Sequence, residues 1–485
     1  MDLKPTMLRP CGDMEKYSTS RHSLGLYNGV SIAGRYAVPP GTDINSLKAI
    51  LQHAVAQVVL EQPMMRIGIV DEDKQNPSFV HVPSINIAEH TQWFGASSPE
   101  EVDANLCKHF SFQHGQSWSD IEHRPPWKIA VLPIQGSQKT PAEVEIVYSF
   151  HHAINDGVSG SIFHSRLLET LKSPIKHLAG FDGKKLEVSE PPTLPPPQNE
   201  LVNSRISWPF FLATLWDAFG PSWLKNKPAV LPWKARPYGI SLSNNTSTYL
   251  IRIPTPVAKK LLAAARAHSL TLSPLLHALI VASLSRRLSA TEAPAFEPCT
   301  PISLRRYVPA AAAFDTKKQM LVLVSTADHP VSSSLVTKLR DSSGPDRESA
   351  VWEVAASVKA SMNDKLASLP NDDQGAMLKY VSDFHDFFRK KDGGERGSSW
   401  EISNVGALNG GSDDDSWRLT RAMFSQSASI FGPGFSANIA GIAGGEITIT
   451  LCWNVSVVDN ALMEGLAKDL EVLIPEVANG SPLSL

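Results

Sequence analysis

The sequence has few cysteines, no excess of charge of either sign and no long apolar run. It has 4 cysteines in 485 residues, and 45 Lys and Arg nearly balance 48 Asp and Glu, for a net charge of −3. No CxxC spacing occurs, which argues against a zinc ribbon or a thioredoxin-like site, and so few thiols are typical of reduced, intracellular cysteines. The balanced charge gives no sign of a nucleic-acid partner.

Targeting signals are also lacking. The segment Met1 to Ser20 has no apolar core of a secretory signal, and the C-terminal Pro-Leu-Ser-Leu lacks the basic residue of a peroxisomal signal. The longest apolar run, Leu275 to Leu284, is about half the length needed to cross a bilayer. We therefore expect a cytoplasmic protein without a membrane span.

Several widespread catalytic motifs are absent: no GxxxxGK[ST], HExxH or GxSxG occurs. Gly432-Pro433-Gly434 begins a weak dinucleotide-like match, but it lies in a glycine-rich, strand-like region rather than at a strand-to-helix turn. We set it aside, and nothing in the sequence indicates a metal.

Strand and helix patterns alternate along the chain, whose length suggests roughly two or three domains. The apolar residues predict strands at Val144–Phe150 and Ile447–Trp453 and a helix over Val158–Leu171. Two further helices are expected within Pro256–Leu288, the second with Ser273 as N-cap and Pro274 at its first helical position.

The clearest break is the proline-rich segment Pro191–Asn199, which reads as an extended linker. We therefore expect an N-terminal domain over 1–185, a crossover over 186–245 and a C-terminal domain over 246–485. The crossover carries the aromatic-rich segment Trp208–Leu224. This segment predicts either a helix packed onto both domains or an apolar surface that covers a lipophilic substrate or touches a membrane.

The segment Phe150–Gly160, FHHAINDGVSG, combines a strand end, two histidines, a tight turn and the start of a helix. A histidine at a strand end can serve as a general base at neutral pH. Strand alternation sends His151 and His152 to opposite sides, so one of them faces a given pocket. Asp156 is suited to fixing the turn, and Gly157 suggests a backbone conformation closed to other residues.

HHAINDG resembles the HHxxxDG motif of the coenzyme-A-dependent acyltransferase superfamily, which includes chloramphenicol acetyltransferase, plant BAHD enzymes and condensation domains. Further segments resemble, in order, the fungal alcohol acetyltransferase family, so that the resemblance covers nearly the whole chain. They are Leu8–Tyr36, Pro125–Pro133, the helix pair ending in LTLSPLLHALIVASL, Pro301–Tyr307 (PISLRRY), Ser403–Gly406 (SNVG) and the late strand GGEITITLCWNVSVVD.

The resemblance implies roles for individual residues. His152 matches the catalytic base and His151 the first, structural histidine. Asp156 would pair with Arg305 of PISLRRY and hold the loop. Ser403 and Asn404, at the SNVG position, are candidates for contacts with substrate or with the oxyanion. The DFGWG motif of the plant enzymes is missing, so the coenzyme A contacts stay unassigned.

The resemblance also implies an α/β (α+β) fold of two chloramphenicol-acetyltransferase-like domains with an active-site tunnel between them. We expect a monomeric O-acyltransferase that moves an acyl group, acetyl foremost, from acyl-CoA to a small alcohol, with no permanently bound cofactor. The aromatic crossover hints at a lipophilic, secondary-metabolite acceptor. Alternatives are a carrier-protein thioester as donor, an amine as acceptor, and a non-catalytic or repurposed member of the fold.

Overall fold

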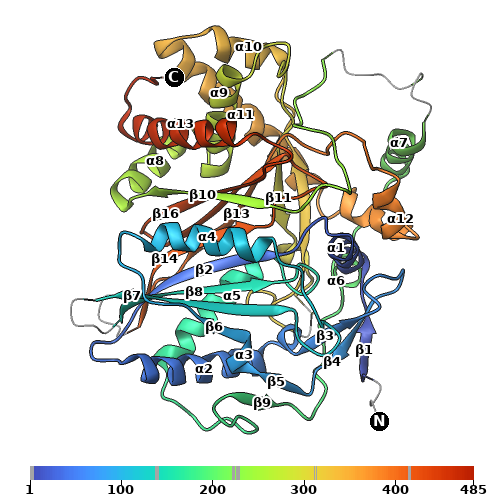
Figure 1. The fold of residues 1–485 in the computed structure, drawn as a ribbon. Helices are drawn as coiled ribbons and strands as arrows, with labels where there is room; N and C mark the ends of the chain where they lie inside the picture. The colour runs from blue at the N-terminus through green and yellow to red at the C-terminus, as the bar shows by residue number, and fades with distance from the viewer. Residues whose placement is uncertain are drawn as a thin grey trace.

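The computed structural model describes residues 5–136, 141–220, 224, 230–310, 312, 314–412 and 417–484. In this part of the chain, helices cover two large sheets that lie one above the other (Figure 1). The predicted mixed α/β architecture is confirmed. The segments 144–150, 158–171 and 447–453 form the expected elements.

The lower sheet has five strands in the order β14-β2-β8-β7-β6 and is antiparallel except for the pair β7 and β6. Helices cover both of its faces, so β8 is buried on both sides. Tyr148 stacks on Phe163 of α5, whereas its neighbour Val147 packs with Phe110 of α4. The elements are β2 (Val30–Ala37), β6 (Thr91–Trp93), β7 (Trp127–Gln135), β8 (Pro141–Phe150), β14 (Arg418–Gln426), α2 (Ile44–Glu61), α4 (Val102–His114) and α5 (Gly157–Lys172).

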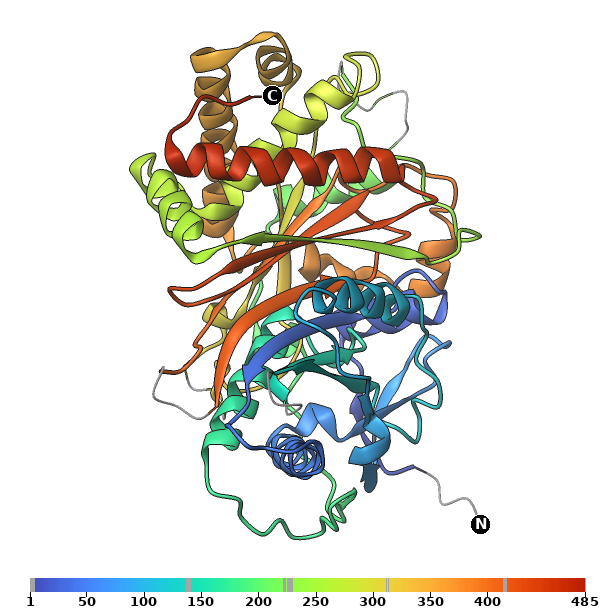
Figure 2. The same ribbon diagram turned by 60° about the vertical axis from the view of Figure 1, so that its left-hand side comes forward.

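The upper sheet has six strands in the order β10-β16-β15-β13-β11-β12. Its helices, α8 to α11 and α13, gather on the side away from the lower sheet (Figures 1 and 2). The strands are β10 (Thr246–Ile253), β11 (Cys299–Ser303), β12 (Val324–Asp328), β13 (Glu401–Leu408), β15 (Phe435–Ile442) and β16 (Ile447–Asn454). The helices are α8 (Thr255–Ala267), α9 (Leu272–Arg287), α10 (Ser333–Asp341), α11 (Gly344–Ser368) and α13 (Asn460–Asn479).

Smaller elements complete the described chain. One small sheet has the strand order β1-β4-β3, and another pairs β5 with β9. Their strands are β1 (Met7–Pro10), β3 (Ile67–Val70), β4 (Ser78–His81), β5 (Ser84–Asn86) and β9 (Lys185–Glu187). The other helices are α1 (Asp13–Ser23), α3 (Ile87–His90), α6 (Gln198–Leu201), α7 (Trp208–Phe219), α12 (Phe384–Arg389) and the short 3₁₀ turns η1 (Pro63–Met65), η2 (Arg305–Tyr307) and η3 (Gln374–Tyr380).

Strand β14 joins the two halves of the molecule. It follows the upper-sheet strand β13 along the chain, yet it pairs with β2 at the edge of the lower sheet (Figure 2). Buried Arg421 on β14 donates to Glu145 of β8 at 2.8 Å and forms an ion pair with Asp103 of α4. A strand from the second half therefore belongs to the sheet of the first half, and the boundaries at 185 and 246 stay a prediction.

Two local predictions need correction. The second helix of the 256–288 segment begins at Leu272, so Thr271 is its N-cap and Ser273 lies inside its first turn. The linker is extended as predicted up to Pro197, but its last residues start α6. The Thr271 side chain makes no capping hydrogen bond, so the usual signal of the N-cap is missing here.

Helix α7 does not pack onto both halves. It lies at the edge of the molecule (Figure 1), where Phe211 contacts Tyr380, while Trp208 is 75% exposed and Leu212 58% exposed. No single helix among the described residues is apolar and long enough to cross a membrane. The helices α8 and α9 pass that test only as a pair, which is bent by 95°.

Buried histidines make the stability of this fold depend on pH. Burial lowers the pKa of His90, His109, His164 and His329 to about 4 and that of His114 to about 3. In the unfolded chain these rings take up protons near pH 6.5, whereas the folded state holds them neutral. The stability they contribute is present above pH 6.5 and is lost as the pH falls toward 4.

We therefore expect the free energy of unfolding to fall between pH 6.5 and 4.5, by about 1.4 kcal/mol per pH unit for each such histidine. Denaturant unfolding across this range measures the slope. His109→Leu removes one buried ring and should flatten the slope by about that amount, whereas His177→Leu, at an exposed ring, serves as the control. An unchanged slope in His109→Leu would contradict the prediction.

Candidate active site

The HHAINDG segment forms the connection from β8 to α5. Asp156 is the N-cap of α5, and its Oδ1 accepts hydrogen bonds from the Ser159 backbone N–H at 2.8 Å and from the Ser159 hydroxyl at 2.9 Å. This is the capping expected of an aspartate before a helix. The two histidines come just before it, at the end of β8, so the cap fixes where the histidine loop ends and the helix begins.

The second carboxylate oxygen of Asp156 is bound from the other half of the chain. Arg305 Nη1 donates to Asp156 Oδ2 at 2.5 Å, and the backbone N–H of Leu323 donates to the same oxygen at 3.0 Å. Arg305 Nη2 also donates to the Leu321 carbonyl at 3.1 Å. The predicted Asp156–Arg305 pair is present, and it lowers the pKa of Asp156 although burial alone would raise it.

Gly157 is needed for space rather than for an unusual backbone conformation. Its φ does not lie in the left-handed region, so the prediction of a special conformation is wrong. A Cβ at this position would instead lie 2.8 Å from Cγ1 of Val405 on β13. The glycine thus lets the start of α5 approach the strand that carries Ser403.

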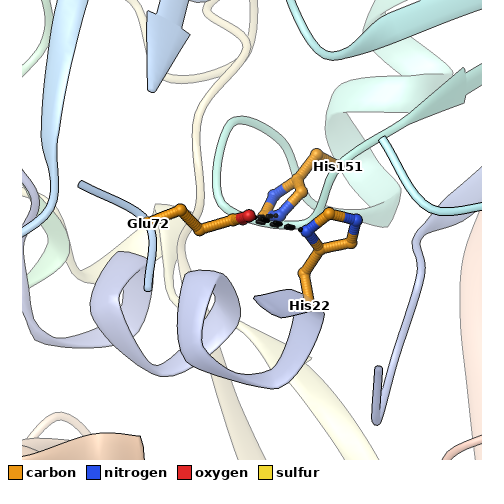
Figure 3. Close-up of side chains that lie close together, drawn as sticks. All are labelled: His22, Glu72 and His151. Atoms are coloured by element: carbon orange, nitrogen blue, oxygen red, sulfur yellow. Dashed lines mark hydrogen bonds and ion pairs between the residues drawn. The ribbon is translucent and has the colours of Figure 1, made fainter. Parts of the chain in front are cut away.

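His151 is buried in a cluster with Glu72 and His22 (Figure 3). Its Nε2 donates to Glu72 Oε1 at 2.9 Å, and its Nδ1 accepts from the Ala153 backbone N–H at 2.9 Å. His22 repeats this pattern: Nδ1 lies 2.9 Å from Glu72 Oε1, and Nε2 accepts from the Trp118 backbone N–H. Every ring nitrogen has a partner, which sets the neutral tautomer of both rings.

These three side chains have the composition of a metal site, but their hydrogen bonds speak against that use. Each imidazole already points an N–H at Glu72, and each remaining lone pair accepts a backbone N–H. A metal needs a deprotonated nitrogen lone pair, so binding would break these bonds. The cluster instead joins the turn after β3, the end of α1 and the histidine loop. Burial alone would raise the pKa of Glu72, but the hydrogen bonds from the two histidines lower it to about 2, so this carboxylate stays ionised.

His152 faces the other way, into a cavity of about 570 Å³ between the two sheets. The cavity is lined by one face of α1, by the histidine loop, and by β11, β12, β13 and β14. The Nδ1 atom of His152 is buried and has no hydrogen-bond partner, so Nε2 is the nitrogen open to the cavity. No hydrogen bond joins Asp156 to this ring, and Asp156 therefore does not act as a charge relay in this arrangement.

Burial and the positive charge of Arg21 lower the pKa of His152. The backbone carbonyl of His152 itself, and Asp156, oppose this effect in part. At neutral pH the ring is thus neutral and has a free lone pair at Nε2. A neutral imidazole that faces a cavity is the state required of a general base.

The structure separates the two predicted residues of β13. Ser403 lines the cavity of His152, whereas Asn404 is exposed on the opposite face, where its Nδ2 donates to Ser273 Oγ at 3.3 Å. The alternation of side chains along a strand explains the split. Asn404 could therefore contact only a part of a substrate that lies outside this cavity.

The sequence did not indicate several residues that line the cavity. Met14, Tyr17, Ser18 and Arg21 line it from one face of α1, at helical spacing. Opposite them is Glu401, which accepts a hydrogen bond from Gln426 at 2.7 Å and whose pKa burial raises. These four α1 residues belong to the Leu8–Tyr36 segment and are spaced i, i+3, i+4, i+7. This spacing, which places them on one face of a helix, is the signal from which they could have been predicted.

Solved structures that resemble the whole chain define the class of its fold. The chain matches the TRI3 trichothecene 15-O-acetyltransferase from Fusarium sporotrichioides with a TM-score of 0.71 and 14% identity, over 97% of this chain and 94% of that one. It also matches the first condensation domain of the calcium-dependent antibiotic synthetase, with a TM-score of 0.61 and 12% identity, over 98% and 96%. The molecule has the chloramphenicol-acetyltransferase-like fold of acyltransferases and condensation domains.

The family follows from the sequence comparison. The model of the alcohol acetyltransferase family matches residues 100–468, and the chain belongs to this family of acyltransferases. Among curated proteins it is 28% identical to a probable alcohol acetyltransferase, FCK4, of Fusarium pseudograminearum, over 99% of this chain and 97% of the relative. It is 22% identical to the probable alcohol acetyltransferase crmB of Aspergillus fumigatus, over 93% and 96%.

The Asp156–Arg305 pair leads to a prediction about stability. In Asp156→Asn the guanidinium of Arg305 stays buried without its counter-ion, which typically costs about 3–5 kcal/mol. We expect a much lower melting temperature and lower turnover, but unchanged relative rates among acceptors. A panel of alcohols assayed beside thermal melts measures both, and normal melting with normal turnover would contradict the prediction.

Proposed function

We propose that this protein transfers an acetyl group from acetyl-CoA to the hydroxyl of an alcohol, with His152 as general base. The observation that carries the proposal is the neutral imidazole of His152, whose free Nε2 faces a cavity between the two sheets. Membership of the alcohol acetyltransferase family supports the acetyl group and the alcohol. The TRI3 enzyme, which shares the fold, is by its name an O-acetyltransferase.

The reaction needs one base and no covalent enzyme intermediate. His152 Nε2 takes the proton of the acceptor hydroxyl while that oxygen attacks the thioester carbonyl carbon. The tetrahedral intermediate then collapses, the C–S bond breaks, and the imidazolium returns the proton to the coenzyme A thiolate. Both substrates must be bound together for this step, so the kinetics are those of a ternary complex rather than ping-pong.

The other site residues have supporting roles in this proposal. The negative charge on the intermediate calls for hydrogen-bond donors, and the Ser403 hydroxyl, on the same cavity wall, is the candidate. Asp156 with Arg305, and His151 with Glu72, hold the loop from its two ends, and both carboxylate oxygens of Asp156 are already bound by protein groups. A cavity between two sheets also limits hydrolysis of the thioester by water.

A thiol-release assay tests the proposal. Wild-type protein should release thiol from acetyl-CoA only when an alcohol is present, and His152→Ala should lose about 100-fold or more of kcat/KM, the usual contribution of a general base. Mass spectrometry of the product identifies the ester. His53→Ala, which alters a histidine outside the cavity, is the matched control and should keep wild-type activity.

The alternatives appear as separate outcomes of the same assay. Release only with an N-acetylcysteamine or carrier-protein thioester would indicate a donor of the condensation-domain type. Release only with amines would indicate amide formation. No release with any donor, from protein that melts like a folded enzyme, would overturn the proposal in favour of a repurposed fold.

The pKa of His152 predicts how activity depends on pH. Because burial and Arg21 lower this pKa, the base stays deprotonated below its ordinary value of about 6.5. We expect kcat/KM to stay level from pH 7.5 to 6, and Arg21→Met, which removes the nearby charge, to move the acidic limb to higher pH. A profile that already falls through pH 7 in wild-type protein would contradict this assignment.

A further inference from the structure

The cavity face of α1 carries polar groups that have no partner in the protein. The Ser18 hydroxyl oxygen and the Arg21 Nε atom are both buried without a hydrogen-bond partner. Among the described residues, no acidic side chain forms an ion pair with Arg21. A buried polar group without a partner is costly, and a cation more so. Ser18 and Arg21 line the cavity one turn apart on the same face of α1, and the Arg21 Nη groups also have no hydrogen-bond partner among the described residues. Together they indicate a ligand that the Nη groups reach directly and that the enclosed Ser18 hydroxyl reaches once its side chain rotates.

Two tyrosines hold the guanidinium of Arg21 in place. Its central carbon lies 4.5 Å from the centre of the Tyr17 ring and 4.6 Å from the centre of the Tyr27 ring. These contacts stabilise the charge through the ring faces and leave the N–H donors free. The Tyr27 ring is in turn 5.8 Å from the ring of His152, measured between centres. Arg21 is therefore held on the cavity wall one ring away from His152.

The opposite wall offers an acceptor of hydrogen bonds. The Tyr27 hydroxyl donates to Gln426 Oε1 at 2.8 Å, and Gln426 Nε2 donates to Glu401 Oε1 at 2.7 Å. This chain of bonds fixes the orientation of the Glu401 carboxyl, whose other oxygen has no hydrogen-bond partner among the described residues. Glu401 and Arg21 both line the cavity, but they form no direct ion pair.

These walls select by charge and by hydrogen bonding. Arg21 repels a cation, and the carboxyl groups of Glu401 and Asp328, which line the same cavity, do not favour an anion. An acceptor without polar groups leaves Arg21 and Glu401 without a hydrogen-bond partner. A hydroxyl group satisfies both, because it accepts a hydrogen bond from a guanidinium and donates one to a carboxylate. The ligand that fits is neutral and carries a hydroxyl besides the one that reacts.

We propose that the acceptor is a neutral polyhydroxylated molecule, and that Arg21 and Ser18 on one wall and Glu401 on the other bind a second hydroxyl that is not acylated. This inference rests on the proposed acyl transfer and names its substrate class. It replaces the lipophilic acceptor that the aromatic crossover suggests. Arg21, Ser18 and Glu401 are specificity-determining residues, and His152 acts on the other hydroxyl.

The test compares acceptors of one chain length. With acetyl-CoA as donor, kcat/KM is measured for 1-hexanol, for the hexanediols with the second hydroxyl at carbons 2 to 6, for 6-hydroxyhexanoate and for (6-hydroxyhexyl)trimethylammonium. We expect at least one diol to exceed 1-hexanol and both charged analogues by about tenfold or more, as for a site built to hydrogen-bond a hydroxyl. In Arg21→Met and Ser18→Ala, the ratio of diol to 1-hexanol should fall toward one.

Lys16→Met is the matched control, because it removes a cation from the same helix outside the cavity; it should keep the wild-type ratio. Transfer without preference for any diol, or a preference that survives Arg21→Met, overturns the inference while acyl transfer stands. If no alcohol is acylated, isothermal titration calorimetry with each hexanediol tests whether the site binds a second hydroxyl. Binding that Arg21→Met weakens about tenfold supports the site, and equal or no binding in wild type and variant overturns it.

Discussion

The ion pair between Asp156 and Arg305 is the constraint on which the active-site geometry depends. It joins residues 149 positions apart in the chain, from the two halves of the molecule. Removing both charges from water is expensive, and only good geometry with further hydrogen bonds compensates for it. Here the carboxylate also caps α5 and accepts a hydrogen bond from the Leu323 N–H. These hydrogen bonds can form together only when the start of α5, the segment before β12 and η2 take up this one relative position.

The histidine loop is held at its other end by a second long-range contact. Glu72 binds His151 and His22 at once, and the backbone N–H groups of Ala153 and Trp118 complete both rings. His152 lies between these two attachments, and its ring forms no hydrogen bond with another described residue. Neighbouring groups thus fix the backbone, while His152, the proposed base, keeps Nε2 free on the cavity side. Fixing a catalytic group in this way avoids reorganisation during the reaction.

The sequence predicts the local parts of this arrangement and misses most of the long-range ones. The periodicity at 144–150 and 158–171 places the histidine loop between a strand and a helix, and the family motif pairs Asp156 with Arg305. Neither signal indicates Glu72, which reaches His151 from 79 residues away. No local pattern predicts that β14 pairs with β2 in the lower sheet. The arginine at 421 is explained only by its partner Glu145, which is distant in the sequence.

For the nature of the acceptor, the place of the aromatic crossover in the fold matters more than its amino-acid composition. The aromatic residues of the crossover suggest an apolar ligand, but α7 lies at the edge of the molecule, and none of its described side chains lines the cavity of His152. Its exposed Trp208 therefore says nothing about the substrate. Apolar side chains such as Val30 and Phe424 line much of this cavity. Its hydroxyl, amide and charged groups come from α1, β13 and β14, which are far apart in the sequence and meet only in the folded chain. Because substrate selection depends on groups that share one enclosed space, we expect the residues around His152, rather than the aromatic crossover, to determine which acceptor is used.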